Sequence, residues 1–185
     1  MKTLFKNILV LVVMSVTFNN YANATLEVLP TFNNVKKGNS ITVTDATGAV
    51  IFSGRINFDG NISRLYDFSQ LKDGLYSIEV NKDYVIEISA VEVKNNSVYF
   101  IEHKNIKVFK PVFRIFEDSI IISKLALDTP EMEVKLYYED ELIYSETVKG
   151  KEILNRAYKI DKTIKGEYSV IVKTNDRVYV ENFRI

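Results

Sequence analysis

Apolar and polar side chains alternate with a period of two through most of the chain, and this pattern restricts the possible folds more than any other feature. β-Branched and aromatic residues dominate these runs, as is typical of half-buried strands. No window between them has the periodicity of an amphipathic helix. The pattern therefore predicts an all-β, antiparallel protein. The clearest runs are 41–44, 76–80, 85–88, 133–136, 168–172 and 177–180.

Short turn signals separate the runs at a spacing that favours a β-sandwich or barrel. One of them, Asp59-Gly60-Asn61, has the oxygen-rich composition of a calcium loop. It lacks the further spaced acidic residues of such a loop, so we interpret it as a hairpin turn. The other signals are residues 37–39, 47–48, 73–74, 95–96, 139–140, 149–150 and 165–166.

The chain repeats itself, because residues 48–93 align without gaps on residues 140–185. A period-two pattern that stays in phase over several strands predicts that both copies bury the same faces. We therefore expect two tandem immunoglobulin-like antiparallel β-sandwich modules. The identical pairs are Ile51/Ile143, Ser53/Ser145, Arg64/Arg156, Tyr66/Tyr158, Gly74/Gly166, Tyr76/Tyr168, Ser77/Ser169 and Val80/Val172.

The start of the chain has the three parts of a secretory signal peptide. Lys2 and Lys6 precede a short apolar run at residues 8–16, and Ala22-Asn23-Ala24 supplies a cleavage site. We expect residues 1–24 to be cleaved, which leaves modules at 25–96 and 112–185 and a connecting strand or linker at 97–111. No later segment is apolar enough to be a transmembrane segment.

Composition excludes several classes of chemistry. The chain has no cysteine and one histidine, so disulfides, zinc–thiolate clusters and thiol nucleophiles are excluded. His103 stands between two charged residues with no evident nucleophile, so we interpret it as a surface residue. The 24 basic and 24 acidic residues cancel, and loss of Lys2 and Lys6 makes the mature chain weakly acidic. We expect no cofactor, no metal and no nucleic-acid partner.

Both copies carry a Gly-x-Tyr motif that leads into an alternating strand. The motifs are Gly74-Leu75-Tyr76 and Gly166-Glu167-Tyr168. In immunoglobulin-like sandwiches, a tyrosine at this place bonds back to the upstream backbone and forms a tyrosine corner. The glycine would permit the preceding turn. We interpret Gly74, Tyr76, Gly166 and Tyr168 as a structural corner in each module.

Two passages resemble a known family. Residues 41–52 contain a strand, an Asp, a turn glycine and an apolar strand, and residues 65–78 contain the Leu-x-x-Gly-x-Tyr passage. Both are similar to Bacteroidetes-type C-terminal sorting modules of type IX secretion, and to short exported immunoglobulin-like proteins of the same bacteria. The second copy matches more loosely, because Glu139-Asp140 replaces the glycine turn. The resemblance implies an exported sandwich protein.

Aromatic side chains offer the clearest candidates for a binding surface. Tyr137 and Tyr138 are adjacent, so they point to opposite faces of a strand and one of them should be exposed. An exposed aromatic could contact a protein or a glycan, whereas core packing is the alternative. The apolar segment 119–125 is expected to form a central strand; at an edge it could pair with another chain.

These observations lead to three hypotheses about function. The first is a non-catalytic exported protein that contacts a protein or glycan in the periplasm or at the cell surface. The alternative is a type IX sorting or anchoring module, whose second copy docks to the secretion machinery. The third is a small hydrolase, which the sequence disfavours because catalytic carboxylates need a cleft that a strand pattern does not reveal.

Overall fold

The computed structural model describes residues 34–61, 68–101, 105–116 and 118–185. Within these residues the chain is all-β, with antiparallel strands and one short 3-10 turn, η3 (Phe68–Gln70). The prediction of an all-β antiparallel protein is therefore confirmed. None of the helical structure in these ranges has the length and apolar character needed to cross a bilayer. The predicted signal peptide, residues 1–24, lies outside the described residues.

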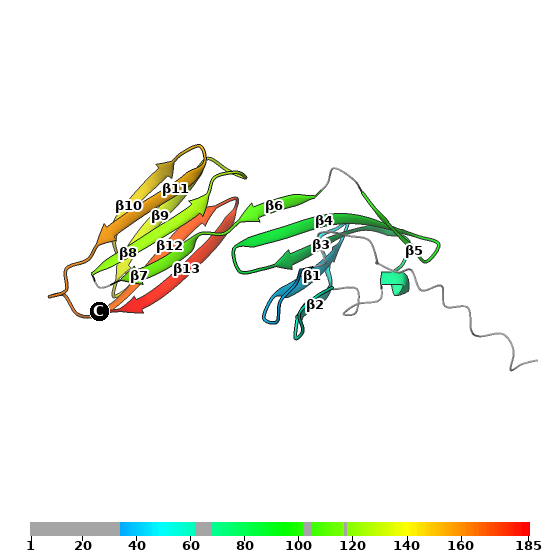
Figure 1. Ribbon diagram of the computed structural model, residues 1–185, viewed down its shortest axis with the longest axis horizontal. Coiled ribbons are helices and arrows are strands. Elements are labelled where there is room, and N and C mark those ends of the chain that lie inside the picture. Colours follow the sequence, from blue (N-terminus) through cyan, green and yellow to red (C-terminus); the bar gives the residue numbers. More distant parts are fainter. Residues whose placement is uncertain (1–33, 62–67, 102–104, 117) are drawn as a thin grey trace, which may run out of the picture.

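The first half of the chain forms one six-stranded sheet (Figure 1). Its strand order is β2-β1-β3-β4-β5, and β6 also pairs with β4. Strands β5 and β6, which fall in the predicted connecting segment 97–111, thus extend the first sheet, and only Lys110 and Pro111 separate β6 from the next strand. The strands are β1 (Ser40–Asp45), β2 (Val50–Arg55), β3 (Gly74–Asn81), β4 (Val85–Lys94), β5 (Ser97–Phe100) and β6 (Ile106–Phe109).

The second half contains two sheets with the orders β11-β8-β7 and β10-β9-β12-β13. Figure 1 shows them as two facing layers. The segment 119–125 is the middle strand of the smaller sheet, as its apolar sequence predicts. The strands are β7 (Val112–Phe116), β8 (Ser119–Leu125), β9 (Glu131–Tyr138), β10 (Glu141–Lys149), β11 (Ile153–Lys159), β12 (Glu167–Thr174) and β13 (Arg177–Arg184).

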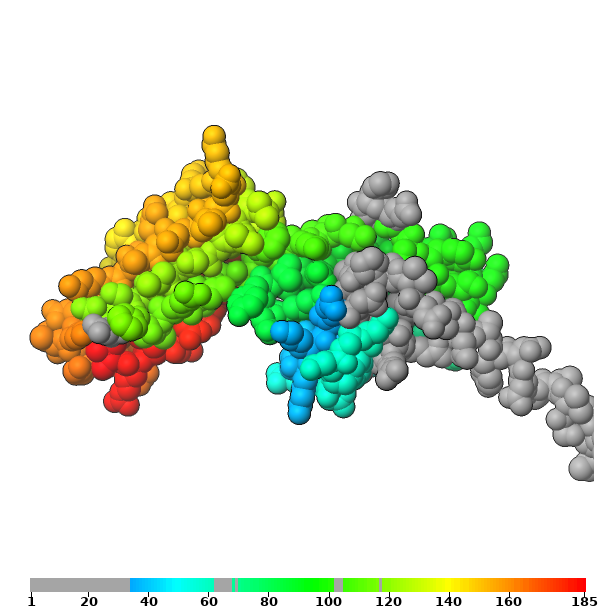
Figure 2. Space-filling view, in the orientation of Figure 1, coloured from blue at the N-terminus to red at the C-terminus, as the bar shows by residue number. Residues whose placement is uncertain are grey.

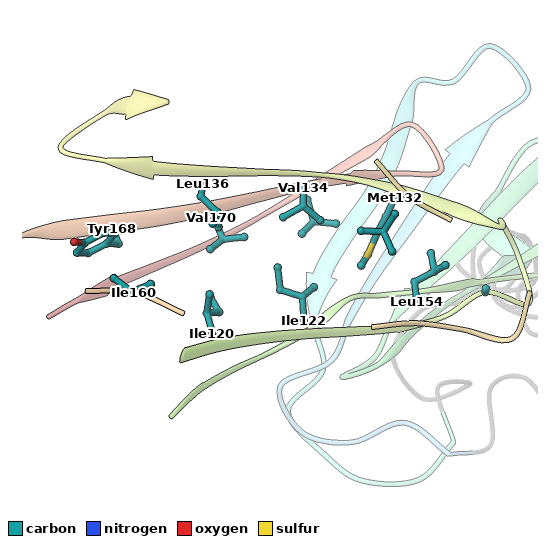
Figure 3. Packing of buried hydrophobic residues seen from close by; sticks show 12 residues of the cluster. Ile120, Ile122, Met132, Val134, Leu136, Leu154, Ile160, Tyr168 and Val170 are labelled. Carbon is teal, nitrogen blue, oxygen red and sulfur yellow. The ribbon is translucent and has the colours of Figure 1, made fainter. Parts of the chain in front are cut away.

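One apolar core joins these two sheets into a β-sandwich (Figure 3). Ile120 and Ile122 of β8 point toward Val134 of β9 and Val170 of β12, and all four are fully buried. Alternation places every second residue of each strand in this layer, which is why the period-two pattern is so regular here. Burying each such side chain stabilises the fold by roughly 1.5–3 kcal/mol.

The internal repeat is visible in the strand pairing. The orders β2-β1-β3-β4 and β10-β9-β12-β13 are the same, and the register of β3 on β4 agrees with that of β12 on β13. The pairing of β1 with β3 is displaced by one residue from that of β9 with β12. Tyr76 pairs with Val91, and the aligned residue Tyr168 pairs with Phe183. The residues that align with β11 in the repeat, 61–67, lie largely outside the described residues. Within those residues, the first half is a single sheet.

Burial follows the repeat on one face of the shared sheet. Ile78 and Val80 of β3 are fully buried, as are the aligned Val170 and Val172 of β12. These positions confirm that both copies turn the same side of this strand toward a core.

Other apolar pairs of the repeat are exposed in both copies and do not belong to a core. Val50 and Ile51 of β2 are 61% and 44% exposed, and the aligned Leu142 and Ile143 of β10 are 49% and 52% exposed. The reason is topological, because β2 and β10 are both edge strands. An edge strand has a neighbour on only one side to cover it.

Candidate functional site

The two corner tyrosines make equivalent hydrogen bonds. Tyr76 Oη donates to the Lys72 carbonyl over 2.8 Å, and Tyr168 Oη donates to the Ile164 carbonyl over 3.0 Å. Each bond spans four residues and closes the turn before its strand. Tyr168 is buried against Phe183, whose ring centroid is 5.5 Å away, whereas Tyr76 is only half-buried. The second corner is therefore better packed than the first.

The two corner glycines differ in what they allow. A Cβ on Gly166 would lie 2.5 Å from Glu139 Oε1 and 2.6 Å from Tyr138 Cε2, so only glycine fits there. A Cβ on Gly74 would meet nothing closer than 3.7 Å, and the φ of Gly74 is not positive. The expected need for a glycine in the turn therefore does not apply to Gly74. At Gly166 a glycine is needed because the neighbouring side chains pack closely against it.

Tyr137 and Tyr138 are both half-buried, which differs from the expectation that one of them is exposed. The ring of Tyr138 packs 5.0 Å from that of Tyr168, and its hydroxyl donates to the Lys165 carbonyl over 3.0 Å. Tyr137 lies between its cross-strand partners Leu142 and Ser169. Tyr138 is therefore held by specific contacts, whereas Tyr137 is one of the residues that line a hollow between β10 and β11.

Other tyrosines are exposed instead, namely Tyr84, Tyr99 and Tyr144. Tyr84 follows Lys82-Asp83 in the turn between β3 and β4, a polar context that could have indicated its exposure. Tyr144 lies on the edge strand β10, and no pattern in the sequence marks a strand as an edge. The arrangement of the strands therefore decides which tyrosines are the most exposed.

An aromatic-lined hollow of about 380 Å³ opens between the edge strands β10 and β11. The rings of Tyr144 and Tyr158 lie 5.7 Å apart in its wall. Tyr158 Oη donates to Glu146 Oε1 over 2.7 Å. Burial first, and then the neighbouring Glu146 carboxylate, raises the pKa of the Tyr158 phenol, so this hydroxyl stays protonated. The arrangement suits contact with an apolar group better than acid–base chemistry.

A larger hollow, of about 850 Å³, lies where the two halves meet. Its walls include Tyr84 of the first half, and Arg114, Leu125 and Ile153 of the second. The second-half residues belong to the three-stranded sheet, and Figure 2 shows β11, β8 and β7 side by side on the viewed face, in orange, yellow-green and green. Its described lining includes no carboxylate.

A buried ion pair of the second half lies next to this hollow. Lys124 and Asp128 form the pair, and their side chains are only 0% and 7% exposed. Asp128 also accepts a hydrogen bond from Asn175 and, over 2.8 Å, from the backbone amide of Phe109 at the end of β6. Buried charges are costly unless they are fully paired. This network therefore holds the end of β6 against the second half.

Two further contacts connect the halves. Arg177 of β13 forms a two-pronged ion pair with Glu79 of β3, with distances of 2.6 and 3.1 Å. Hydrogen bonding to Glu79 raises the pKa of the Arg177 guanidinium. Lys110 Nζ donates to Asn81 Oδ1 over 2.9 Å and to the Lys82 carbonyl over 2.8 Å. Desolvation lowers the pKa of the Lys110 ammonium group.

The described residues contain no group of three or more His, Cys, Asp or Glu side chains arranged to hold a metal ion. Asp59, the acid of the Asp59-Gly60-Asn61 turn, accepts a hydrogen bond from the Lys37 amide over 2.7 Å. Gly60 pairs with Val35 in an isolated bridge. This segment is a turn held by backbone contacts. His103 lies outside the described residues.

A protein-family comparison matches the chain at residues 18–94 to the secretion system C-terminal sorting domain. The resemblance inferred from the sequence is therefore confirmed. The match covers β1 to β4 and the residues before them, so it falls on the first copy of the repeat. It begins within the segment predicted as a signal peptide.

Two solved structures share a distant likeness with the chain. A biofilm-associated protein BSP domain is 11% identical with a TM-score of 0.31, and the alignment covers 80% of this chain. The chain spans only 24% of that structure. Extracellular domains 3–5 of Drosophila OTK are 6% identical with a TM-score of 0.24, over 80% of this chain and 85% of that one. No curated protein sequence matches this chain.

Proposed function

We propose that the chain is an exported protein whose first half is a sorting or anchoring module of a type IX secretion system. The match of residues 18–94 to the sorting-domain family carries this proposal. It favours the first copy as the part that contacts the secretion machinery, rather than the second copy. The cell surface is the destination that such a module implies.

The turn between β1 and β2 supports a role for the first copy in particular. Asp45 Oδ1 accepts hydrogen bonds from the Thr47 amide over 2.9 Å, the Thr47 hydroxyl over 2.6 Å and the Ala49 amide over 3.0 Å. Gly48 completes the turn with a φ of 87°. In the second copy, Glu139 and Asp140 take φ values of 46° and 65°. The copies therefore present differently shaped turns to a partner.

A reporter protein inserted between residues 24 and 25 of the full chain tests this proposal. In a host with a type IX secretion system, we expect the reporter at the cell surface. The double variant Asp45→Ala/Gly48→Val should keep it in the periplasm, because it removes the turn of the first copy. The matched variant Glu139→Ala/Asp140→Ala should still reach the surface. Equal periplasmic abundance of both variants before export excludes a folding defect.

A reporter that stays in the periplasm with the unaltered chain would contradict the sorting role. Loss of surface display only in the Glu139→Ala/Asp140→Ala variant would assign docking to the second copy instead. Either result is read by protease accessibility on intact cells, which distinguishes the surface from the periplasm.

We also propose that the protein is non-catalytic and acts through contact with a protein or glycan. The exposed Tyr144 and Tyr84, each beside a hollow, are the observation that favours this role. Aromatic side chains of this kind supply large contact areas with little loss of entropy. Capture from native envelopes with the full chain, compared with Tyr84→Ala and Tyr144→Ala variants, tests it. Equal capture by all three proteins would argue against these surfaces.

A further inference from the structure

Strand β10 leaves one long edge of the second sandwich without a partner. It pairs with β9 on one side, and no strand within the described ranges pairs with its other side. It is nine residues long, compared with five for β7, seven for β11 and eight for β13, the other edge strands of this half. The outward amide and carbonyl groups of such an edge form a template for a further strand.

The first part of β10 carries an exposed apolar run. Leu142, Ile143 and Tyr144 are consecutive and are 49%, 52% and 47% exposed. A shift in register between Leu142 and Tyr144 marks an irregularity at Ile143. Natural edge strands are often protected by charged side chains or by β-bulges. Here no charged residue occurs between Glu141 and Glu146.

The edge is also held in place from within. Glu146 of β10 accepts hydrogen bonds from Tyr158 over 2.7 Å and from Arg156 over 3.3 Å, and both donors belong to β11. These bonds connect β10 to the opposite sheet across the open side of the sandwich. A strand that is already ordered loses little conformational entropy when another strand pairs with it.

The charges of β10 indicate which strand would pair with its open edge. Glu141 stands at the start of β10 and Lys149 at its end, each four residues from Ser145. Glu139 and Asp140 extend the acidic end, and Lys151 extends the basic end. Two β10 strands that run antiparallel about Ser145 therefore bring the acidic end of each beside the basic end of the other. Opposite charges across paired strands are stabilising.

We propose that β10 is a dimerisation edge, and that its partner is β10 of a second copy of this chain. The two copies are related by a two-fold axis near Ser145, and their four-stranded sheets join into one continuous sheet. Such an interface is self-complementary, so it closes as a dimer. In this antiparallel pairing Leu142 of one copy lies opposite Val148 of the other, and Ile143 lies opposite Thr147.

Strand β2 of the first half provides a matched control. It is also an edge strand with exposed apolar residues, and its Ile51 aligns with Ile143 in the repeat. It is only six residues long, and it has no acid at its start, because it begins at Val50. The same substitution at Ile51 therefore changes an exposed apolar edge residue without touching the proposed interface.

Sedimentation equilibrium of the mature full chain tests the proposal. We expect a monomer–dimer equilibrium, and Ile143→Lys should lower the association constant at least ~tenfold, because it puts a charge in the centre of the shared edge. Ile51→Lys should leave the constant unchanged. Circular dichroism checks that both variants fold. We expect both to fold, because Ile143 and Ile51 are exposed in the structure.

A charge exchange gives a second, independent test. Glu141→Lys alone and Lys149→Glu alone should each weaken the dimer, since each brings like charges together. An equimolar mixture of the two variants should dimerise again, because every pair at the interface then has opposite charges. A chain that stays monomeric up to roughly 100 μM would overturn the proposal. So would a dimer that resists Ile143→Lys, or a mixture that shows no recovery.

Discussion

The first and second halves share one sheet order but complete that sheet in different ways. In the first half, β5 and β6 pair with β4 and extend the sheet. In the second half, the equivalent strand β13 is a bare edge. Ile86 on β4 is therefore 2% exposed because Val108 of β6 pairs beside it, whereas the aligned Val178 on β13 is 59% exposed. The same apolar position is core in one copy and surface in the other.

This difference shows what duplication preserves. Strand order depends on backbone pairing within the copied segment and is the same in both halves, and so is the register of β3 on β4 and of β12 on β13. Burial depends on what packs against the segment, and the two copies have different neighbours. Five experiments can break or sharpen the comparison, and they follow from the largest expected effect to the smallest.

The buried ion pairs should give the largest effect. Asp128→Ala leaves Lys124 as an unpaired buried charge and should destabilise the second half by about 3–5 kcal/mol. An ion pair of the first half that does not align with it, Lys82 with Glu87, is more exposed, at 17% and 11%. Glu87→Ala should cost ~1–3 kcal/mol. Urea unfolding followed by tyrosine fluorescence measures both, and equal losses would show that the two sites are energetically alike.

Substitutions of the two corner glycines should give the next largest difference in stability. Gly166→Val forces a side chain against Tyr138 and Glu139, and should destabilise by about 2–3 kcal/mol. Gly74→Val meets no close neighbour and should change the free energy of unfolding by less than ~0.5 kcal/mol. Thermal unfolding of the two variants side by side tests this. A larger loss at Gly74 would contradict the packing explanation.

The corner tyrosines should give a smaller contrast. Tyr168→Phe removes a hydrogen bond in a buried corner and should destabilise by ~1 kcal/mol. Tyr76→Phe removes the same bond in a more exposed corner, so its effect should be smaller. Melting temperatures provide the measurement. An unchanged value for Tyr168→Phe would refute its assignment as a tyrosine corner.

The contact between the halves should be weaker still. Arg177→Gln breaks the ion pair with Glu79, whose side chains are about one-third exposed, and should cost ~1 kcal/mol or less. Its clearer effect should be on cooperativity, since the halves are expected to unfold further apart in temperature. Calorimetry measures the separation. The exposed pair Lys149–Glu131 is a control, because Glu131→Ala should not change it.

The turn carboxylates should give the smallest effect, as a dependence on pH. The hydrogen bond from the Thr47 side chain, followed by backbone amides, lowers the pKa of Asp45. A lowered folded pKa means that the carboxylate stabilises the fold above its unfolded pKa, and that this is lost as pH falls through the folded value. Asp45→Asn should therefore flatten the loss of stability below about pH 4.

Asp161 of the second half allows the same test. The Thr163 amide, over 2.9 Å, and its hydroxyl, over 2.7 Å, donate to Asp161 and lower its pKa. Asp161→Asn should likewise reduce the loss of stability at low pH, and it should do so for the second half alone. Urea midpoints at about pH 5 and pH 3 measure both variants. No change with either variant would show that these turns do not contribute to acid stability.

Much of this protein was determined by the sequence alone. The alternation of side chains predicted the all-β class, because a pleated strand turns successive residues to opposite faces. The repeat predicted a shared pairing of strands, and the Asp45 to Gly48 turn carried the family resemblance. Residues 119–125 were recognised as a central strand from their apolar content. Each of these inferences concerns local geometry, which nearby residues determine.

The tertiary structure decided which strands are edges and what covers them. Tyr138 and Tyr144 occur in similar sequence contexts, yet Tyr138 packs on Tyr168 and Tyr144 lies open on β10. The need for Gly166 arises from Tyr138 and Glu139, which are distant in sequence. Alternation fixes the face to which a side chain points, but only the arrangement of sheets determines whether anything lies opposite that face.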